Sequence, residues 1–402
     1  MNGKQRMARA MRHEIPDRVP LMCQLALGHY FLNTDIEPHE IWFTSEGFAE
    51  ALLTLRQRYQ FDGILINLPG RDPDWRAHID AIKATDEGEV VQWKNGDRTV
   101  IPWNDNAQHY PKHREAARPL FDEFDPDHDF ERVDDWNLYT WGVYHTPFLP
   151  GKAPGLLTTP PDYFFRTIDL VTERVGDTIS VHGEVFSPFT HFMELFSYED
   201  ALTNLALNPA KAVDILERLT DASIAWGVAQ AQRGLDAVLI SSAYAGGGFI
   251  SKRMYRRFVL PYEQRLVEAI HAQAPGVPVY THTCGHLGDR LELLMETGTD
   301  GVDTLDPPPI GDTELDVAKT QIGERMFIKG NMNSVFLLQC QDVADVLAHA
   351  RERLRDGMPG GGYILSTACS VSPLVAPEKL EALHNLVYTE GRYREGQVDE
   401  SS

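Results

Sequence analysis

Eight short apolar runs, separated by longer segments of helical periodicity, constrain the fold of this chain more than any other feature. The runs are Val19–Gln24, Gly63–Asn67, Ile179–Glu184, Ala237–Ser241, Val277–His282, Gly301–Leu305, Met326–Lys329 and Tyr363–Ser366. Apolar runs that alternate with helices are typical of parallel strands joined by crossover helices. Eight such units are the number in a (β/α)8 TIM barrel, so we predict an α/β fold of this architecture.

The segments between the runs predict the helices that cover the barrel. They include Glu46–Tyr59, Asp162–Val175, Pro209–Arg233, Lys252–Gln273, Leu287–Thr297 and Pro377–Glu390. The chain has 402 residues, a length that α/β barrels with insertions reach as one domain. We therefore predict a single domain over residues 1–402, with a frayed polar tail at 396–402.

One region departs from this alternation. Residues 90–103 alternate polar and apolar side chains around Asn95-Gly96, a pair that favours the tight turn of a β-hairpin. Polar and aromatic loop sequence follows, to about residue 150. We interpret residues 87–155 as an insertion between the second and third barrel strands that serves as a lid or as a contact in a homodimer.

Charge and composition exclude several classes of function. The net charge is −22, whereas nucleic-acid binding needs a basic surface. No apolar stretch is long enough for a membrane span, and the N-terminus lacks the apolar segment of a signal peptide. We therefore expect a cytoplasmic protein with no nucleic-acid or membrane partner. Its four cysteines are too few for a disulfide framework in so large a chain, and indicate metal binding or catalysis.

The most specific motif is His282-x-Cys284, which follows the fifth predicted strand. In extended chain these residues project to the same side, so an imidazole and a thiolate can bind one zinc ion. Cys369 follows the last predicted strand and can supply a second thiolate from across the barrel mouth. Zinc favours such tetrahedral nitrogen and sulfur ligands. The fourth ligand is left open between Asp306, Asp303 and an exchangeable water.

Two further polar residues stand at predicted strand ends, where barrel enzymes place their chemistry. Glu184 is interpreted as a general acid or as a residue that orients a substrate, and the alternative is a structural acceptor for backbone N–H groups. Asn331 is interpreted as a residue that fixes the substrate. The remaining cysteines, Cys23 and Cys340, are interpreted as core thiols.

Four blocks of sequence resemble the uroporphyrinogen decarboxylase superfamily, which contains decarboxylases and corrinoid-dependent methyltransferases built on a TIM barrel. The blocks are MARAMRHEIPDRVP (7–20), HTCGHLGDRLELLMETGTDGVDTLDPPPIGD (282–312), IKGNMN (328–333) and GGGYILSTACSVSP (360–373). The His-x-Cys pair with a late Cys is similar to the zinc motif of the methylcobamide:thiol methyltransferases and related O-demethylase methyltransferases. It also resembles the zinc set of cobalamin-independent methionine synthase.

The resemblance implies that His282, Cys284 and Cys369 bind zinc, with Asp306 or Asp303 as the further ligand. It implies a zinc-dependent methyltransferase that moves a methyl group between a corrinoid and a small thiol, methyl ether or methylamine. The chain has no Asp-x-His-x-x-Gly signature of cobalamin binding, so the corrinoid is expected on a separate protein.

Two alternatives to the methyltransferase are a metal-free decarboxylase of the uroporphyrinogen type and a non-enzymatic metal-storage barrel. Residues 17–24 lack the second arginine and the tryptophan of the decarboxylase pattern. The net charge of −22 also opposes a substrate that carries eight carboxylates.

Overall fold

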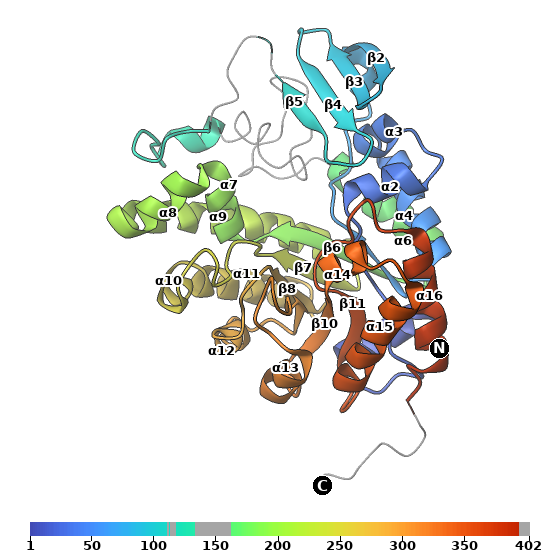
Figure 1. Cartoon of the computed structure of the whole chain (residues 1–402). Coiled ribbons are helices and arrows are strands. Elements are labelled where there is room, and N and C mark those ends of the chain that lie inside the picture. Colours follow the sequence, from blue (N-terminus) through green and yellow to red (C-terminus); the bar gives the residue numbers. More distant parts are fainter. Residues whose placement is uncertain (111, 113–117, 133–161, 394–402) are drawn as a thin grey trace.

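The computed structural model describes residues 1–110, 112, 118–132 and 162–393. Parallel strands form one curled sheet in the order β1-β6-β7-β8-β9-β10-β11 (Figure 1). Their bounds are Gly63–Ile66 (β1), Ser180–Phe186 (β6), Ala237–Ser241 (β7), Val279–Thr283 (β8), Gly301–Thr304 (β9), Phe327–Met332 (β10) and Tyr363–Thr367 (β11). Every residue of these strands is buried, as expected for a parallel sheet covered on both faces. The observed fold is therefore an α/β half-barrel of seven strands.

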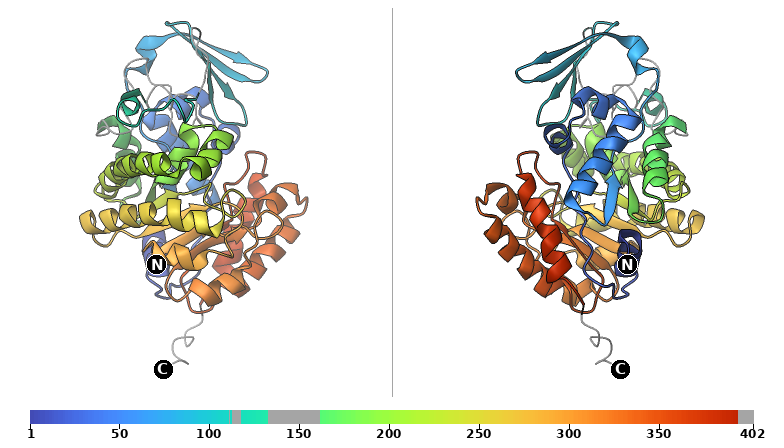
Figure 2. Two further views of the ribbon diagram at one scale, coloured as in Figure 1. Left: turned by 90° about the vertical axis from the view of Figure 1, so that its left-hand side faces the viewer. Right: turned by 90° about the vertical axis from the view of Figure 1, so that its right-hand side faces the viewer.

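Helices lie outside the curled sheet in both views of Figure 2. They are α1 (Gly3–Met11), α2 (Leu27–Asn33), α3 (Pro38–Phe43), α4 (Ser45–Tyr59), α6 (Arg166–Val175), α7 (Pro188–Leu195), α8 (Tyr198–Leu207), α9 (Pro209–Ala231), α10 (Lys252–Phe258), α11 (Leu260–Gln273), α12 (Leu291–Glu296), α13 (Leu315–Ile322), α14 (Ser334–Gln339), α15 (Val343–Gly357) and α16 (Pro377–Thr389). None of the helices in the described ranges has the length and apolar composition needed to cross a bilayer.

The first predicted strand, Val19–Gln24, is the one that does not join the regular sheet. Within the described chain, one isolated parallel bridge joins Leu21 to Leu365 on β11, and on the other side the N–H of Asp62, just before β1, donates to the Leu21 carbonyl at 2.8 Å. The physical reason lies in its backbone donors. Pro20 has no N–H group, and the N–H of Leu21 donates to the Asp62 carboxylate (2.8 Å) instead of to a neighbouring strand. The segment thus occupies the eighth position without a continuous ladder.

A buried ion cluster holds this segment in place. Asp62 precedes β1, and its carboxylate lies 2.6 Å from Arg6 and 2.8 Å from Arg18. Arg6 also contacts Asp17 at 2.7 Å. Because both arginines are almost fully buried, the cluster ties α1 and the start of the segment to the first strand.

Prolines account for two differences between expected and observed bounds. β8 begins at Val279 instead of Val277, because Pro278 cannot donate to a ladder. The helix predicted over 252–273 is divided into α10 and α11 at Val259, since Pro261 lacks the donor that a continuous helix needs.

A second sheet stands at the upper end of the molecule in Figures 1 and 2, between β1 and β6 in the chain. Its antiparallel strands are β2 (Ile79–Thr85), β3 (Gly88–Trp93), β4 (Arg98–Pro102) and β5 (Gln108–Tyr110). Asn95 and Gly96 lie in the turn between β3 and β4, where Gly96 has a φ of +92°. Within the predicted 87–155 insertion, residues 111, 113–117 and 133–155 fall outside the described residues, and so does the predicted tail 396–402. A lid or homodimer role for the insertion stays a prediction.

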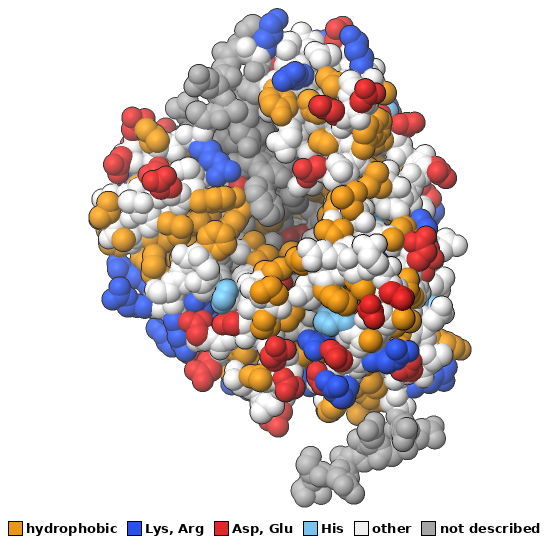
Figure 3. Space-filling model, viewed as in Figure 1, with side chains coloured by type: hydrophobic (Ala, Val, Ile, Leu, Met, Phe, Trp, Pro, Cys, Tyr) orange, Lys and Arg blue, Asp and Glu red, His pale blue; other side chains and the backbone are white. Residues whose placement is uncertain are grey.

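The space-filling view in Figure 3 shows acidic and basic side chains interspersed over this face. The same face is hollowed near its centre, below the second sheet. The loop after β1 leads to that sheet, so the hollow lies on the side of the carboxyl ends of the barrel strands. This is the side on which barrel enzymes place their chemistry.

Candidate metal centre

A row of four polar residues crosses the barrel sheet at one level. Ser241 on β7 is in register with His282 on β8, His282 with Asp303 on β9, and Asp303 with Lys329 on β10. Registered neighbours in a parallel sheet project to the same side, and all four side chains are buried. The row therefore places an imidazole, a carboxylate and an ammonium group side by side.

The ligand atoms of His282, Cys284 and Cys369 all lie within 4.8 Å of one another. His282 is on β8, Cys284 directly follows that strand, and Cys369 follows β11 on the other side of the curled sheet. Cys284 Sγ is 3.3 Å from His282 Nε2. The structure therefore brings together the three residues that the sequence predicts as zinc ligands.

The other ring nitrogen of His282 is held from behind. Nδ1 lies 2.6 Å from Thr304 Oγ1 and 3.6 Å from an oxygen of Asp303. Such outer contacts fix the orientation of a metal-ligating imidazole and leave Nε2 free to bind. Thr304 adopts a φ of +89°, which is strained for a β-branched residue. This backbone strain occurs at the residue whose hydroxyl group contacts the His282 ring.

Asp303 itself is engaged by Lys329. The ammonium group is 3.0 Å from each carboxylate oxygen, and both side chains are nearly inaccessible. Burial alone would raise the pKa of Asp303, but Lys329 and His282 together lower it. Asp303 is therefore a carboxylate that is already paired, and its position beside Nδ1 suits it to orient His282.

The thiols and the imidazole form a strongly polarised group. A hydrogen bond from Cys284, with a further contribution from His282, holds the pKa of Cys369 well below its usual range. The same interaction with Cys369, together with burial, raises the pKa of Cys284. Burial opposes the charged form of His282, yet its interactions with the acidic groups of Asp303 and Cys369 raise its pKa to about 10. The group without a metal thus holds one thiolate beside a protonated imidazole, and a metal ion that binds here would release the His282 proton.

Local backbone contacts set the positions of the two cysteines. The N–H of Cys369 donates to Ser334 Oγ at 3.0 Å, and that hydroxyl donates to the Cys369 carbonyl at 3.2 Å. Gly246 passes so close to Cys284 that a Cβ at this position would lie 2.3 Å from the Cys284 carbonyl oxygen. Only glycine permits this approach.

The donor set fits zinc on its own chemistry. A buried imidazole nitrogen and two thiol sulfurs meet at one point, and the imidazole is oriented from behind by Thr304 and Asp303. Asp306 is not part of this group. It is buried, which raises the pKa of its carboxyl group, and Oδ2 accepts a hydrogen bond from the N–H of Gly285 at 2.8 Å. Its assignment as the fourth ligand stays a prediction.

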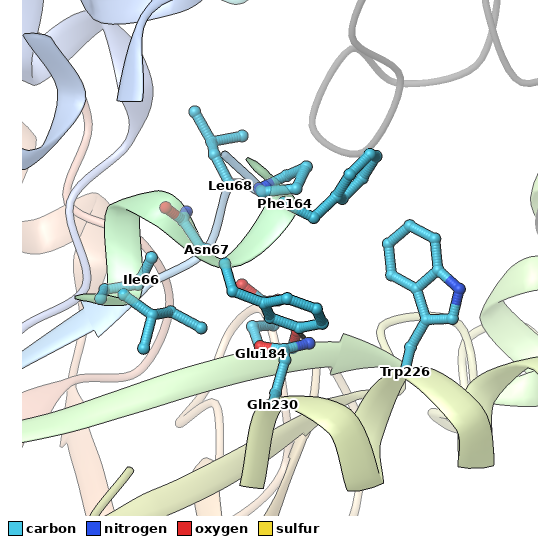
Figure 4. A pocket seen from close by; sticks show the side chains of 10 residues that line it. Ile66, Asn67, Leu68, Phe164, Glu184, Trp226 and Gln230 are labelled. Atoms are coloured by element: carbon cyan, nitrogen blue, oxygen red, sulfur yellow. Dashed lines mark hydrogen bonds between the residues drawn. The ribbon is translucent and has the colours of Figure 1, made fainter. Parts of the chain in front are cut away.

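Glu184 lies on β6 and lines a small cavity (Figure 4). Figure 4 shows Asn67, Phe164, Trp226 and Gln230 around the same space. Oε2 of Glu184 is buried and has no hydrogen-bond partner within the described part of the chain. Burial raises the pKa of this carboxyl group to about 7. A carboxyl group with such a pKa can both hold and release a proton near neutral pH.

Asn331, on β10, is fully buried and its amide is occupied. Nδ2 donates to the carbonyls of Leu305 at 2.8 Å and Thr313 at 3.2 Å, and Oδ1 accepts from Arg353 at 3.4 Å. These contacts connect Asn331 to the loop that carries Asp306. The predicted contact of Asn331 with a substrate stays a prediction.

Sequence reasoning missed Thr304, Lys329 and Ser334. Lys329 ends the predicted strand 326–329, and a lysine within an apolar run is a signal that a buried acidic partner is nearby. Thr304 had no such signal, because its contact with His282 depends on a positive φ. Ser334 resembles an ordinary helix-start residue in sequence.

Comparisons with known proteins identify the family of the chain. A family model described as uroporphyrinogen decarboxylase (URO-D) matches residues 156–389. The chain is 31% identical over 286 residues to a uroporphyrinogen decarboxylase of Alkalilimnicola ehrlichii, covering 63% of this chain and 74% of that protein. It is 26% identical over 218 residues to the methylcobamide:CoM methyltransferase MtaA of Methanosarcina barkeri, covering 54% of this chain and 60% of that protein.

The fold matches a solved structure along almost its full length. A methyltransferase from Methanosarcina mazei superposes with a TM-score of 0.68 and 17% identity, covering 96% of this chain and 98% of that one. This likeness concerns the fold. With the family match over residues 156–389 and relatives among both decarboxylases and a corrinoid methyltransferase, the chain belongs to the uroporphyrinogen decarboxylase family.

Proposed function

We propose that the protein is a zinc-dependent methyltransferase that moves a methyl group between a corrinoid and a small thiol, methyl ether or methylamine. The observation that carries the proposal is the meeting of the ligand atoms of His282, Cys284 and Cys369 within 4.8 Å. The relative named methylcobamide:CoM methyltransferase supports the same class of reaction. A separate protein would carry the corrinoid.

His282, Cys284 and Cys369 would hold the zinc, and Asp306 is the proposed fourth ligand or yields its place to the substrate. Bound zinc would supply Lewis acidity, which favours the deprotonated form of a thiol or polarises an ether oxygen. Thr304 and Asp303 keep the His282 ring turned so that Nε2 faces the sulfurs. Lys329 keeps Asp303 ionised and therefore able to perform this task.

Glu184 is the proposed proton carrier. Burial raises the pKa of its carboxyl group, which favours acceptance of the proton that a thiol loses, or donation of one to a departing alkoxide. The neighbouring cavity walls of Phe164 and Trp226 restrict water and maintain the raised pKa. We propose that Asn331 helps to fix the substrate by holding the loop after β9 in place. Its side-chain amide donates to the Leu305 carbonyl in that loop.

Metal analysis of the purified protein tests the zinc site. We expect about one zinc per chain in the wild type and in Cys340→Ser, and loss of zinc in Cys369→Ser. Cys340 is a matched control because it is half-buried like Cys284 and Cys369, yet the one hydrogen bond of its Sγ among the described groups goes to the Asp342 carbonyl. A folded wild type that binds no zinc would contradict the proposal.

A transfer assay then tests the reaction. Free methylcobalamin replaces the corrinoid protein, and a panel of small thiols is offered as acceptors. Loss of the methyl–cobalt absorbance should require zinc and should fail in Cys369→Ser. Zinc binding without transfer to any thiol, and without demethylation of ethers or amines in the reverse assay with cobalt(I), would refute the methyltransferase class.

A second candidate function is a metal-free decarboxylase, which the relatives named uroporphyrinogen decarboxylase favour. The matched regions cover 74% and 50% of the two proteins compared. This function predicts that Cys284→Ser keeps full activity on a porphyrinogen substrate. If the protein is a methyltransferase, neither the wild type nor Cys284→Ser should turn over a porphyrinogen.

A further inference from the structure

A second cavity, of about 810 Å³, contains none of the residues of the metal centre. It lies where the start of α4, the loop after β1 and the start of α6 meet. Phe43, Trp75 and Tyr163 contribute aromatic walls, and Arg71 lines the same space. A volume of this size is within the range of small-molecule binding sites, about 300–1,000 Å³.

Arg71 is 5% exposed, yet its guanidinium is mostly unbonded. Nε donates to the Trp42 carbonyl at 2.5 Å, and the group stacks on the Trp42 ring at 4.9 Å. Nη1 and Nη2 are buried and have no hydrogen-bond partner in the part of the chain that the structure describes. Burial lowers the pKa of Arg71 to about 9, so the group is still a cation at neutral pH.

The other charged groups around the cavity already have partners. Arg166 pairs with Glu46 at 3.3 Å, and Arg233 lies 3.4 Å from both Asp162 and Asp169. The last two lining groups, Arg76 and Asp72, are also engaged, Arg76 by Glu40 and Asp72 by the N–H of Asp74 at 2.8 Å. Among the described residues that line this cavity, Arg71 is therefore the cation without an anionic partner.

Buried charges in proteins are normally paired and hydrogen-bonded, because an unpaired one loses its hydration without compensation. The outer edge of a guanidinium presents parallel N–H groups that match the two oxygens of a carboxylate or phosphate. We propose that this cavity binds a small organic anion. Its carboxylate or phosphate would accept two hydrogen bonds, one from Nη1 and one from Nη2 of Arg71.

The walls indicate the rest of the ligand. Phe43 and Trp75 stack on each other at 4.8 Å with an interplanar angle of 19°, and together they offer an aromatic surface beside the charged end. Aromatic side chains favour offset or edge contacts with a planar apolar group. An aromatic acid or aromatic phosphate therefore combines the two features of the site better than a free inorganic ion.

Calorimetric titration at constant ionic strength tests the proposal with three probes: benzoate, phenyl phosphate and neutral benzyl alcohol. The wild type should bind at least one of the two anions saturably and should not bind benzyl alcohol. The tighter anion identifies the carboxylate or the phosphate class. Arg71→Met should weaken that binding by about tenfold or more. Arg71→Lys keeps the positive charge but cannot form two parallel hydrogen bonds, and it should also weaken the binding.

Arg166→Met is the matched control, since Arg166 lines the same cavity but has a carboxylate partner. Its affinity for the anion should stay within about threefold of the wild type. Each variant is first shown to be folded by its melting curve, and Arg71→Met should melt no lower than the wild type in the absence of anion.

The proposal is overturned if neither anion saturates the wild type, or if Arg71→Met binds as tightly as the wild type. Zinc content is measured in parallel, so that failure of the metal centre is distinguished from failure of this site.

Discussion

The pH dependence of stability is a direct test of the buried state of Glu184. Burial raises the pKa of this carboxyl group to about 7 from an ordinary value of 4.5. At about 1.4 kcal/mol for each pKa unit, ionised Glu184 destabilises the folded chain by about 3 kcal/mol. Glu184→Gln carries no charge at any pH and escapes this penalty.

The sign follows from the direction of the pKa shift. A pKa that is higher in the folded than in the unfolded chain gives a contribution to stability that is complete below pH 4.5 and is lost as pH rises through 7. Between pH 5 and pH 8 the wild type should therefore lose about 2–3 kcal/mol of unfolding free energy relative to Glu184→Gln.

Urea unfolding of chelator-treated wild type and variant across this pH range gives the required difference. Treatment with a chelator matters because a bound cation near His282 would lower the pKa of Glu184. Glu263→Gln is a positive control, because burial also raises the pKa of Glu263 to about 7. Glu292→Gln is a negative control, since that side chain is 79% exposed. A wild-type minus Glu184→Gln difference that does not change with pH would refute the assignment of a buried, protonatable carboxyl group.

Two further predictions concern the surroundings of the metal centre and the closure of the barrel. Thr304→Val removes the hydroxyl that contacts Nδ1 of His282 at 2.6 Å. Zinc affinity, measured by competition with a chelator, should fall by about 10–100-fold while the fold persists, and an unchanged affinity would show that Thr304 does not orient the ring. Asp62→Ala leaves Arg18 buried without its carboxylate partner and removes the acceptor for the Leu21 N–H. Unfolding free energy should fall by about 3 kcal/mol or more in urea, and a loss below about 1 kcal/mol would contradict a structural role for this cluster.

Much of the fold could be predicted because a parallel sheet is buried on both faces, so that its strands are visible as apolar runs. Seven of the predicted runs became strands of the curled sheet, with bounds within a few residues. The first run failed for a local reason that the sequence contains, namely Pro20, and a non-local one that it does not, the capture of the Leu21 N–H by Asp62. An apolar run alone does not reveal where its backbone donors will bond.

The same distinction applies to the candidate site. His282, Cys284 and Cys369 could be predicted because strand ends in a barrel converge, which makes position along the chain a guide to position in space. The contact of Thr304 with His282 could not, since it depends on one unusual backbone angle. Nor could the state of Arg71, because an arginine in a loop gives no sign that it will be buried without a partner.

The pairing of Asp303 with Lys329 bears on the open question of the fourth zinc ligand. Sequence alone leaves the choice open between Asp306, Asp303 and an exchangeable water, because both aspartates belong to the strand after the motif or follow it directly. In the folded chain both oxygens of Asp303 lie 3.0 Å from the ammonium group of Lys329, and one faces Nδ1, the ring nitrogen of His282 that points away from the sulfurs. To bind the metal, Asp303 would have to leave a buried cation unpaired, which is strongly unfavourable. The carboxylate of Asp306 accepts one hydrogen bond among the described groups, from the N–H of Gly285, so this side chain can move at lower cost. The proposed exchangeable position is therefore better assigned to Asp306 or to a substrate that displaces it, while Asp303 orients the imidazole.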